Sequence, residues 1–132
     1  MEESSKQLLL KDLCSRLNTK LVCSIYRTDD QWVGYRDEIL HGYCKGDIWY
    51  EFYFGEDCGI GIDDVSKIKP YLFPLSSMTE EQEEEYNDLN SYELGCFPHT
   101  EGALDYLIKN HFDYRGLIPM GLAIDATVLD IY

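Results

Sequence analysis

Histidine and cysteine are the residue types in this chain best suited to binding a metal ion, and their spacing decides whether they can. A structural zinc site needs closely paired thiolate or imidazole ligands, because four ligands must converge tetrahedrally. His41 and Cys44 are close enough in sequence to form one such pair, but no second pair accompanies them. The acidic run after position 79 lacks the alternating ligands and central glycine of an EF-hand loop. The sequence therefore predicts no metal and no cofactor.

Motifs for phosphate binding and for nucleophilic catalysis are also missing from the sequence. A dinucleotide-binding fingerprint has three glycines leading into a helix, whereas Gly59-Ile60-Gly61 supplies two and no helix is expected directly after it. The sequence contains neither a Gly-x-Ser-x-Gly elbow nor a P-loop. We therefore expect a protein that is not an enzyme. A small enzyme with an unrecognised site is the alternative.

The acidic residues are concentrated in one part of the chain. The formal net charge is -14, and no Lys or Arg occurs from Pro70 to Ile108. The candidate acidic interaction face within this segment consists of Glu80, Glu81, Glu84, Glu85 and Asp88. This charge disfavours direct binding to nucleic acid, because the phosphates are also negative. It is compatible with a basic protein partner, with mimicry of nucleic acid, or with a solvated helix face that aids solubility.

Aromatic residues are the other unusual feature, with 11 Tyr and 2 Trp in 132 residues. Large amphipathic rings suit protein interfaces, because they provide contact area at a low cost in conformational entropy. The candidate aromatic contact residues are Trp49, Tyr53, Tyr86 and Tyr92. The alternative is that these rings fill the edge of a small core.

The elements that would position these residues begin with a helix and several strands. Leucines recur with helical periodicity over residues 5–17, and charged Arg16 lies off that apolar stripe. Ser4 or Ser5 is the expected cap of this helix, and Asn18 is expected to end it in the left-handed conformation. Runs rich in branched and aromatic residues then predict strands over 21–27, 32–35, 39–43, 48–54 and 58–62. The charged residues 36–38 separate the second run from the third, and we expect a bulge or a short loop there. Short turns between runs favour an antiparallel sheet, and we expect one that resembles an SH3-like half barrel.

A proline-containing junction separates these strands from the rest of the chain. Pro70 and Pro74 bias the residues before them, Lys69 and Phe73, towards extended conformations. The apolar residues around both prolines indicate that this segment packs against a core. We place residues 1–69, helix plus sheet, before this junction and residues 70–132 after it, packed together as one domain.

The segment after the junction is predicted to be mainly helical. Thr79 with Gln82, or Ser77 with Glu80, fits a capping box, which predicts an acidic helix from about Thr79 to Gly95. A second helix follows from position 100 or 101, and the apolar residues 122–126 near the end of the chain are expected to form a last strand or an extended tail. The predicted fold class is α+β, with an N-terminal helix, a small antiparallel sheet and two C-terminal helices.

Three short segments also carry a resemblance: Lys11-Asp-Leu-Cys14, Lys67 to Glu81, and His111 to Ile118. They are similar to a family of small uncharacterised proteins of gut Bacteroidales, including Bacteroides, and their prophages. The chain departs from that family's pattern at Phe73 and Leu75, where Arg and Met are usual. The resemblance implies a phage or mobile-element origin and a shared fold, and it carries over no catalytic residue.

Cysteine usage and hydropathy indicate the cellular compartment. The five cysteines are widely spaced and odd in number, so we expect small buried hydrophobic residues rather than disulfides. No apolar run is long enough to cross a membrane, and the first residues lack the pattern of a signal peptide. We therefore expect a cytoplasmic accessory or interaction protein that binds another protein. The alternative to an ordinary interaction module is an acidic nucleic-acid mimic that inhibits a basic host protein.

Overall fold

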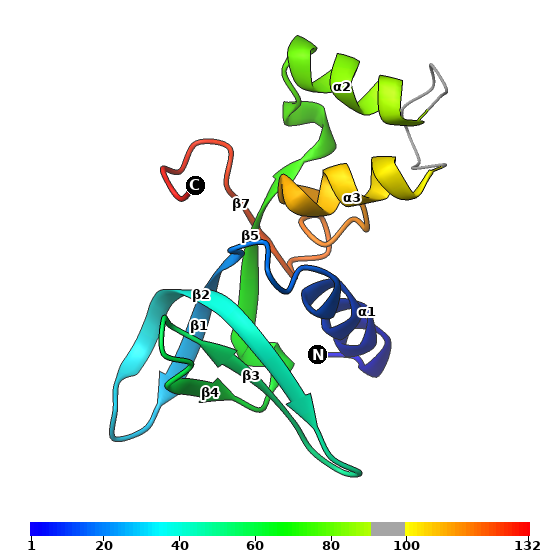
Figure 1. Cartoon of the computed structure of the whole chain (residues 1–132). Coiled ribbons are helices and arrows are strands. Elements are labelled where there is room, and N and C mark those ends of the chain that lie inside the picture. Colours follow the sequence, from blue (N-terminus) through cyan, green and yellow to red (C-terminus); the bar gives the residue numbers. More distant parts are fainter. Residues whose placement is uncertain (91–99) are drawn as a thin grey trace.

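The computed structural model describes residues 1–90 and 100–132, and Figure 1 shows the arrangement of their elements. The first half of the chain contains α1 (Glu3–Ser15), β1 (Val22–Thr28), β2 (Val33–Lys45), β3 (Tyr50–Phe54), β4 (Ile60–Ile62) and the 3-10 helix η1 (Val65–Lys67). The second half contains β5 (Ile68–Pro74), the 3-10 helix η2 (Leu75–Ser77), α2 (Glu80–Asn90), α3 (Glu101–Lys109), β6 (Phe112–Asp113) and β7 (Ile124–Asp125). The α+β class predicted from the sequence is confirmed.

The sheet is mixed, whereas the sequence predicted an antiparallel one. Its strands lie in the order β4-β3-β2-β1-β5-β6, with β7 also paired to β5, and β1 to β5 follow antiparallel pairings. Strands β6 and β7 run parallel to β5. Parallel neighbours need a long crossover connection, and α2 with α3 supplies it between β5 and β6. Among the described residues, β4 and β6 end this strand order and β7 pairs only with β5, and the sheet is not closed into a barrel.

The two predicted C-terminal helices therefore lie between strands of the sheet, and the predicted extended tail contains β7. Several local expectations also differ from the structure. The charged residues 36–38 lie inside the continuous strand β2, which pairs with β1 at these positions, and the irregularity falls between Leu40 and Gly42. Helix α1 begins at Glu3 without a side-chain cap. Asn18 does adopt the left-handed conformation expected of a residue that follows a helix, with φ 70°.

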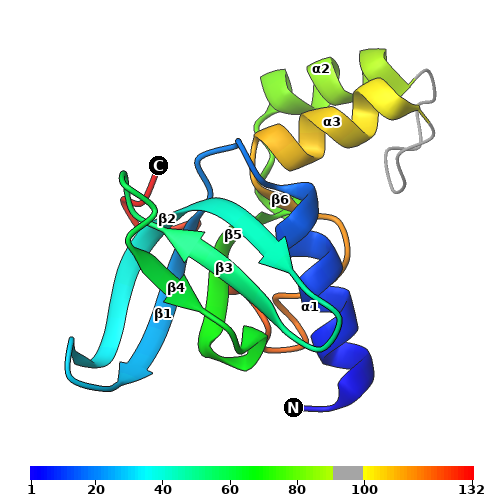
Figure 2. The same cartoon turned by 60° about the horizontal axis from the view of Figure 1, so that its bottom comes forward.

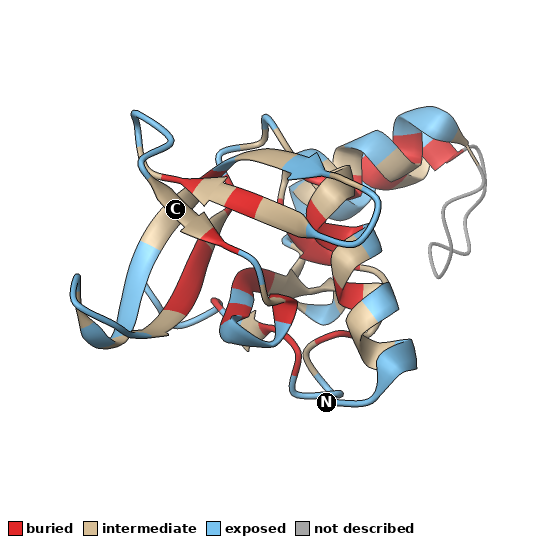
Figure 3. Cartoon of the chain, turned by 90° about the horizontal axis from the view of Figure 1, so that it is seen from below, coloured by how far each residue is buried: buried red, intermediate tan, exposed pale blue. Residues whose placement is uncertain are grey.

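Strand β5 links the two apolar clusters of the described residues. The larger cluster lies between α1 and the sheet and includes Leu9, Leu13, Phe52 and Leu72. The smaller cluster contains Tyr86, Ala103, Leu107 and Phe112, with Phe73 packed against it. Because Leu72 and Phe73 are neighbours in an extended strand, their side chains point to opposite sides, one towards each cluster. In Figure 3, buried residues lie within the strands and helices, and the turns that connect the strands are mainly exposed.

Helices α2 and α3 lie side by side at one end of the molecule, beyond the strands β1 to β4 (Figures 1 and 2). Both extended residues expected at the proline junction, Lys69 and Phe73, lie in β5. No helix among the described residues is long and apolar enough to cross a membrane.

Candidate functional site: the acidic face of α2

The start of α2 is fixed by a reciprocal cap. The Gln82 side-chain carbonyl accepts a hydrogen bond of 3.0 Å from the Thr79 amide, and the Thr79 hydroxyl accepts one of 3.2 Å from the Gln82 amide. This is the capping box expected for Thr79. The alternative cap does not form, because the Ser77 hydroxyl donates to the Pro74 carbonyl at 2.7 Å. Acidic residues in the first helical turn add favourable interactions with the positive end of the helix dipole.

One side of α2 packs on α3, and the opposite side of α2 is exposed to solvent. Tyr86 and Asn90, four residues apart, are the buried residues of this helix, with Tyr86 only 2% exposed. The six acidic side chains of α2 are all exposed, and we call them the acidic face: Glu80, Glu81, Glu83, Glu84, Glu85 and Asp88. The ion pairs of the described residues all lie elsewhere, so none neutralises this face within the part of the chain that the structure describes.

Two separate hydrogen bonds, one from Thr100 and one from Tyr106, hold α2 against α3. The Thr100 hydroxyl donates to the carbonyl of Leu89 at 2.7 Å and accepts from the Ala103 amide at 3.0 Å, so one side chain caps α3 and binds α2. The Tyr106 hydroxyl donates to a Glu85 carboxylate oxygen at 3.0 Å. Burial, with the Glu85 hydrogen bond and charge as further causes, raises the pKa of Tyr106 to about 12, so this hydroxyl keeps its proton at neutral pH.

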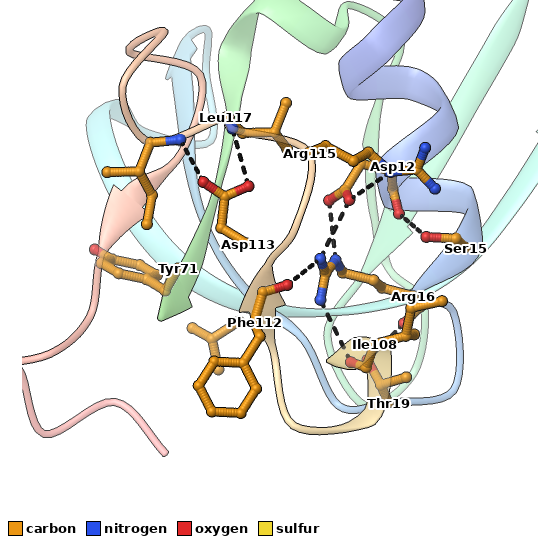
Figure 4. A network of polar contacts seen from close by, with 12 residues as sticks. Asp12, Ser15, Arg16, Thr19, Tyr71, Ile108, Phe112, Asp113, Arg115 and Leu117 are labelled. Atoms are coloured by element: carbon orange, nitrogen blue, oxygen red, sulfur yellow. Dashed lines mark hydrogen bonds and ion pairs between the residues drawn. The ribbon is translucent and has the colours of Figure 1, made fainter. Parts of the chain in front are cut away.

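A buried polar network anchors α1 to the segment that leaves α3 (Figure 4). Arg16 is fully buried and donates to both carboxylate oxygens of Asp12, at 2.9 and 3.2 Å. It also donates to the main-chain carbonyls of Phe112, at 2.6 Å, and Ile108, at 3.4 Å. Arg115 donates to the same Asp12 carboxylate at 3.0 Å. The end of α3 and the start of β6 are thereby joined by hydrogen bonds to Arg16, directly after α1.

The structure does not gather the three described candidate aromatic residues, Trp49, Tyr53 and Tyr86, into one surface. Trp49 is 52% exposed in the turn between β2 and β3, and Tyr53 is half-buried on β3. Tyr86 is buried between α2 and α3, where its ring lies 6.4 Å from that of Tyr106. Tyr92 lies outside the described residues. Of the two surfaces considered from the sequence, the acidic one therefore has all of its residues on a single helix, α2.

The residues considered for metal binding are dispersed. No group of three metal-ligating side chains occurs among the described residues. Cys23 is buried and Cys14 half-buried, but Cys44 and Cys58 are exposed, so the expectation of buried cysteines is wrong for the last two. Cys96 and His99 lie outside the described residues.

Two features were missed by sequence reasoning. The burial of Arg16 was not foreseen, because a charged residue off the apolar stripe normally faces solvent; its spacing of four residues from Asp12 is the signal that could have indicated an ion pair. The second is a cavity beside His111, formed by segments that are distant in the sequence.

No protein-family model, curated protein or solved structure matches the chain.

Proposed function

We propose that this protein is a non-enzymatic interaction module that binds a basic surface of another protein through the acidic face of α2. The observation that carries this proposal is the presence of exposed acidic side chains along one helix, with no ion-paired cation among the described residues. A face of one charge sign, displayed at one end of the molecule, produces a field that accelerates association with an oppositely charged surface.

The helix geometry favours a second, more specific candidate, a nucleic-acid mimic. A helix rises 1.5 Å per residue, so residues 80–88 span about 12 Å and carry about one carboxylate per 2 Å of axis. Double-stranded DNA carries about one phosphate per 1.7 Å of its axis. The acidic face therefore approaches the linear charge density of a duplex over this short length, which suits a basic site that normally binds nucleic acid.

The resemblance of the three sequence segments supports a further part of the proposal, an accessory role in the cytoplasm with a phage or mobile-element origin. A separate part of the proposal, drawn from the short antiparallel strands and not from the resemblance, is that β1 to β4 form an SH3-like half barrel. Strand β2 is visibly curved in Figure 1.

The experiment is affinity capture from a bacterial lysate with the wild-type protein and two charge-matched variants, followed by mass spectrometry. In the first variant, Glu80, Glu81, Glu84 and Glu85 are changed to Gln and Asp88 to Asn. The control removes five exposed acids elsewhere whose side chains make no ion pair or hydrogen bond with the described residues: Asp30, Asp47, Asp63 and Asp130 to Asn, and Glu56 to Gln. Both variants have the same net charge, so the pair separates a local surface from overall charge.

We expect the wild type and the control to retain a basic partner in 50 mM salt and to lose most of it in 500 mM salt, because exposed charges are screened. The acidic-face variant should retain little at either salt concentration. Equal capture by the two variants would refute the proposal. Displacement of the captured partner by a double-stranded oligonucleotide would favour the mimic, whereas retention in its presence would favour an ordinary interaction module.

A further inference from the structure

A cavity of about 390 Å³ lies where β5, α2, the end of α3 and the C-terminal segment meet. This volume falls within the range of 300–1,000 Å³ typical of small-molecule sites. Aromatic rings of Phe73, Phe112 and Tyr132 contribute to its lining. The cavity belongs to neither the acidic face of α2 nor the Asp12–Arg16 network, and it is formed entirely by described residues.

The aromatic wall of this cavity is held in place from several sides. The Tyr132 ring stacks on His111 with centroids 4.0 Å apart and an interplanar angle of 13°, and it lies 5.8 Å from the Phe73 ring. The Tyr132 hydroxyl donates to the Tyr71 carbonyl at 2.8 Å and accepts from the Val22 amide at 3.0 Å. A ring held at its hydroxyl and stacked on one face against His111 can form one side of a preorganised site.

The backbone around His111 is equally constrained. This residue adopts φ 63°, the left-handed region, as the chain leaves α3 and turns towards β6. The His111 amide donates to the carbonyl of Ile108 at 3.2 Å, and the His111 carbonyl accepts from the Phe73 amide at 2.8 Å. The turn therefore fixes Lys109, Asn110 and His111 relative to β5, so that all three contribute to the same lining.

The polar part of the lining contrasts with the rest of the molecule. The chain carries 25 acidic residues, yet none lines this cavity, and Lys109 supplies a cation. Gln82 uses its side-chain carbonyl in the cap of α2, which leaves its amide N–H groups able to donate. The Lys109 ammonium also makes no ion pair among the described residues. The Gln82 amide and the Lys109 ammonium are therefore two free hydrogen-bond donors in a cavity that also has an aromatic wall.

His111 adds an unpaired polar atom at the same place. The residue is 8% exposed, and its Nδ1 is buried without a hydrogen-bond partner among the described residues. Buried polar atoms normally have a partner. Burial, reinforced by the nearby Arg16 charge, lowers the pKa of His111 to about 4, so the imidazole is neutral at physiological pH. The positive charge at this cavity then comes from Lys109.

We infer that this cavity binds a small aromatic carboxylate, with the ring against Phe73 and Tyr132 and the carboxylate towards Gln82 and Lys109. The aromatic wall favours a planar apolar body. The spare N–H groups of Gln82 and Lys109 favour an acceptor that is negatively charged. Because the whole protein is strongly acidic, an anion would bind here only through these local contacts and against the overall field.

The test uses two probes with the same ring and opposite charge, 2-naphthoate and 2-naphthylmethylammonium. Binding of each to the full chain is followed through backbone amide chemical shifts at pH 7.5. We expect 2-naphthoate to bind at least about tenfold more tightly, with the largest shifts at Gln82, Thr127 and residues 109–112. General attraction to an acidic protein would produce the opposite preference, so a tighter ammonium probe or equal affinities would overturn the inference. Shifts confined to other residues, or no binding of 2-naphthoate, would also overturn it.

A matched pair of variants isolates the contribution of the cation. Lys109 and Lys11 are both exposed on helices, and only Lys109 lines the cavity. Lys109→Met should weaken 2-naphthoate binding about two- to fivefold, the loss expected for one exposed charge pair, whereas Lys11→Met should leave it unchanged. Both substitutions lie on exposed positions and are expected to fold, which circular dichroism would verify. Equal binding by both variants would contradict the placement of the carboxylate beside Lys109.

Discussion

The guanidinium of Arg16 donates a 2.6 Å hydrogen bond to the main-chain carbonyl of Phe112, 96 residues further along the chain. Arg16 is fully buried, and its charge is balanced by the buried carboxylate of Asp12. This contact connects Arg16, directly after α1, to β6, and a second hydrogen bond of 3.4 Å, to the carbonyl of Ile108, connects it to α3. The relationship explains how the helical pair that displays the acidic face stays attached to the first half of the fold.

Arg16→Met should destabilise the protein by about 3–5 kcal/mol, because it leaves Asp12 buried with only the partial compensation of Arg115. Lys11→Met, on the exposed side of the same helix, should change the free energy of unfolding by less than about 0.5 kcal/mol. Denaturant unfolding monitored by circular dichroism measures both. Similar stability of the two variants would show that the buried network contributes little.

Asp113→Asn should weaken the turn that follows β6. The two carboxylate oxygens of Asp113 accept hydrogen bonds of 2.9 Å from the amides of Leu117 and Ile118. An asparagine side chain has one oxygen, so one of these buried amides would face another donor, at a cost of about 1–3 kcal/mol. Hydrogen exchange at the Leu117 and Ile118 amides should accelerate. Asp130→Asn is the control, and unchanged exchange in Asp113→Asn would contradict this assignment.

Thr79→Ala should remove the reciprocal cap of α2 and lower stability by about 1 kcal/mol. Its effect should be concentrated in the first turn of the helix, where amide exchange should increase. Ser76→Ala is a suitable control, because Ser76 is exposed and its side chain makes no hydrogen bond with the described residues. If the two alanine variants were equally stable, the cap would be shown to contribute nothing to α2.

Stability should decrease as the pH falls from about 6.5 to about 4, partly because of His111. The folded state holds the pKa of His111 near 4, below the ordinary value of 6.5, so within this window the unfolded chain binds a proton that the folded chain does not. The Arg16 charge and burial beside Tyr132 both disfavour the charged imidazole.

The variant that isolates this effect is His111→Asn, since asparagine tolerates the left-handed backbone at this position. Its free energy of unfolding should depend less on pH between 6.5 and 4 than that of the wild type. The carboxylates titrate in both proteins, so their contribution cancels in the comparison. Exposed His41→Asn should behave as the wild type does, and an identical pH profile for His111→Asn would exclude a role for His111.

Local features of this protein follow from the sequence alone. The Thr79–Gln82 capping box, the left-handed Asn18 and the extended residues before Pro70 and Pro74 each depend on a few neighbouring residues. The position of the acidic helix could be predicted for the same reason, because capping and charge placement act over one or two turns.

The tertiary structure alone decided the features that join distant segments. The parallel pairing of β6 and β7 with β5 depends on where a long crossover returns, which no local pattern specifies. Arg16 is buried because carbonyls from the far end of the chain replace its hydration, so helical periodicity placed it on the wrong side. Likewise, the cavity beside His111 is assembled from β5, α2, α3 and the C-terminal segment, and residues brought together by folding leave no spacing to read in sequence.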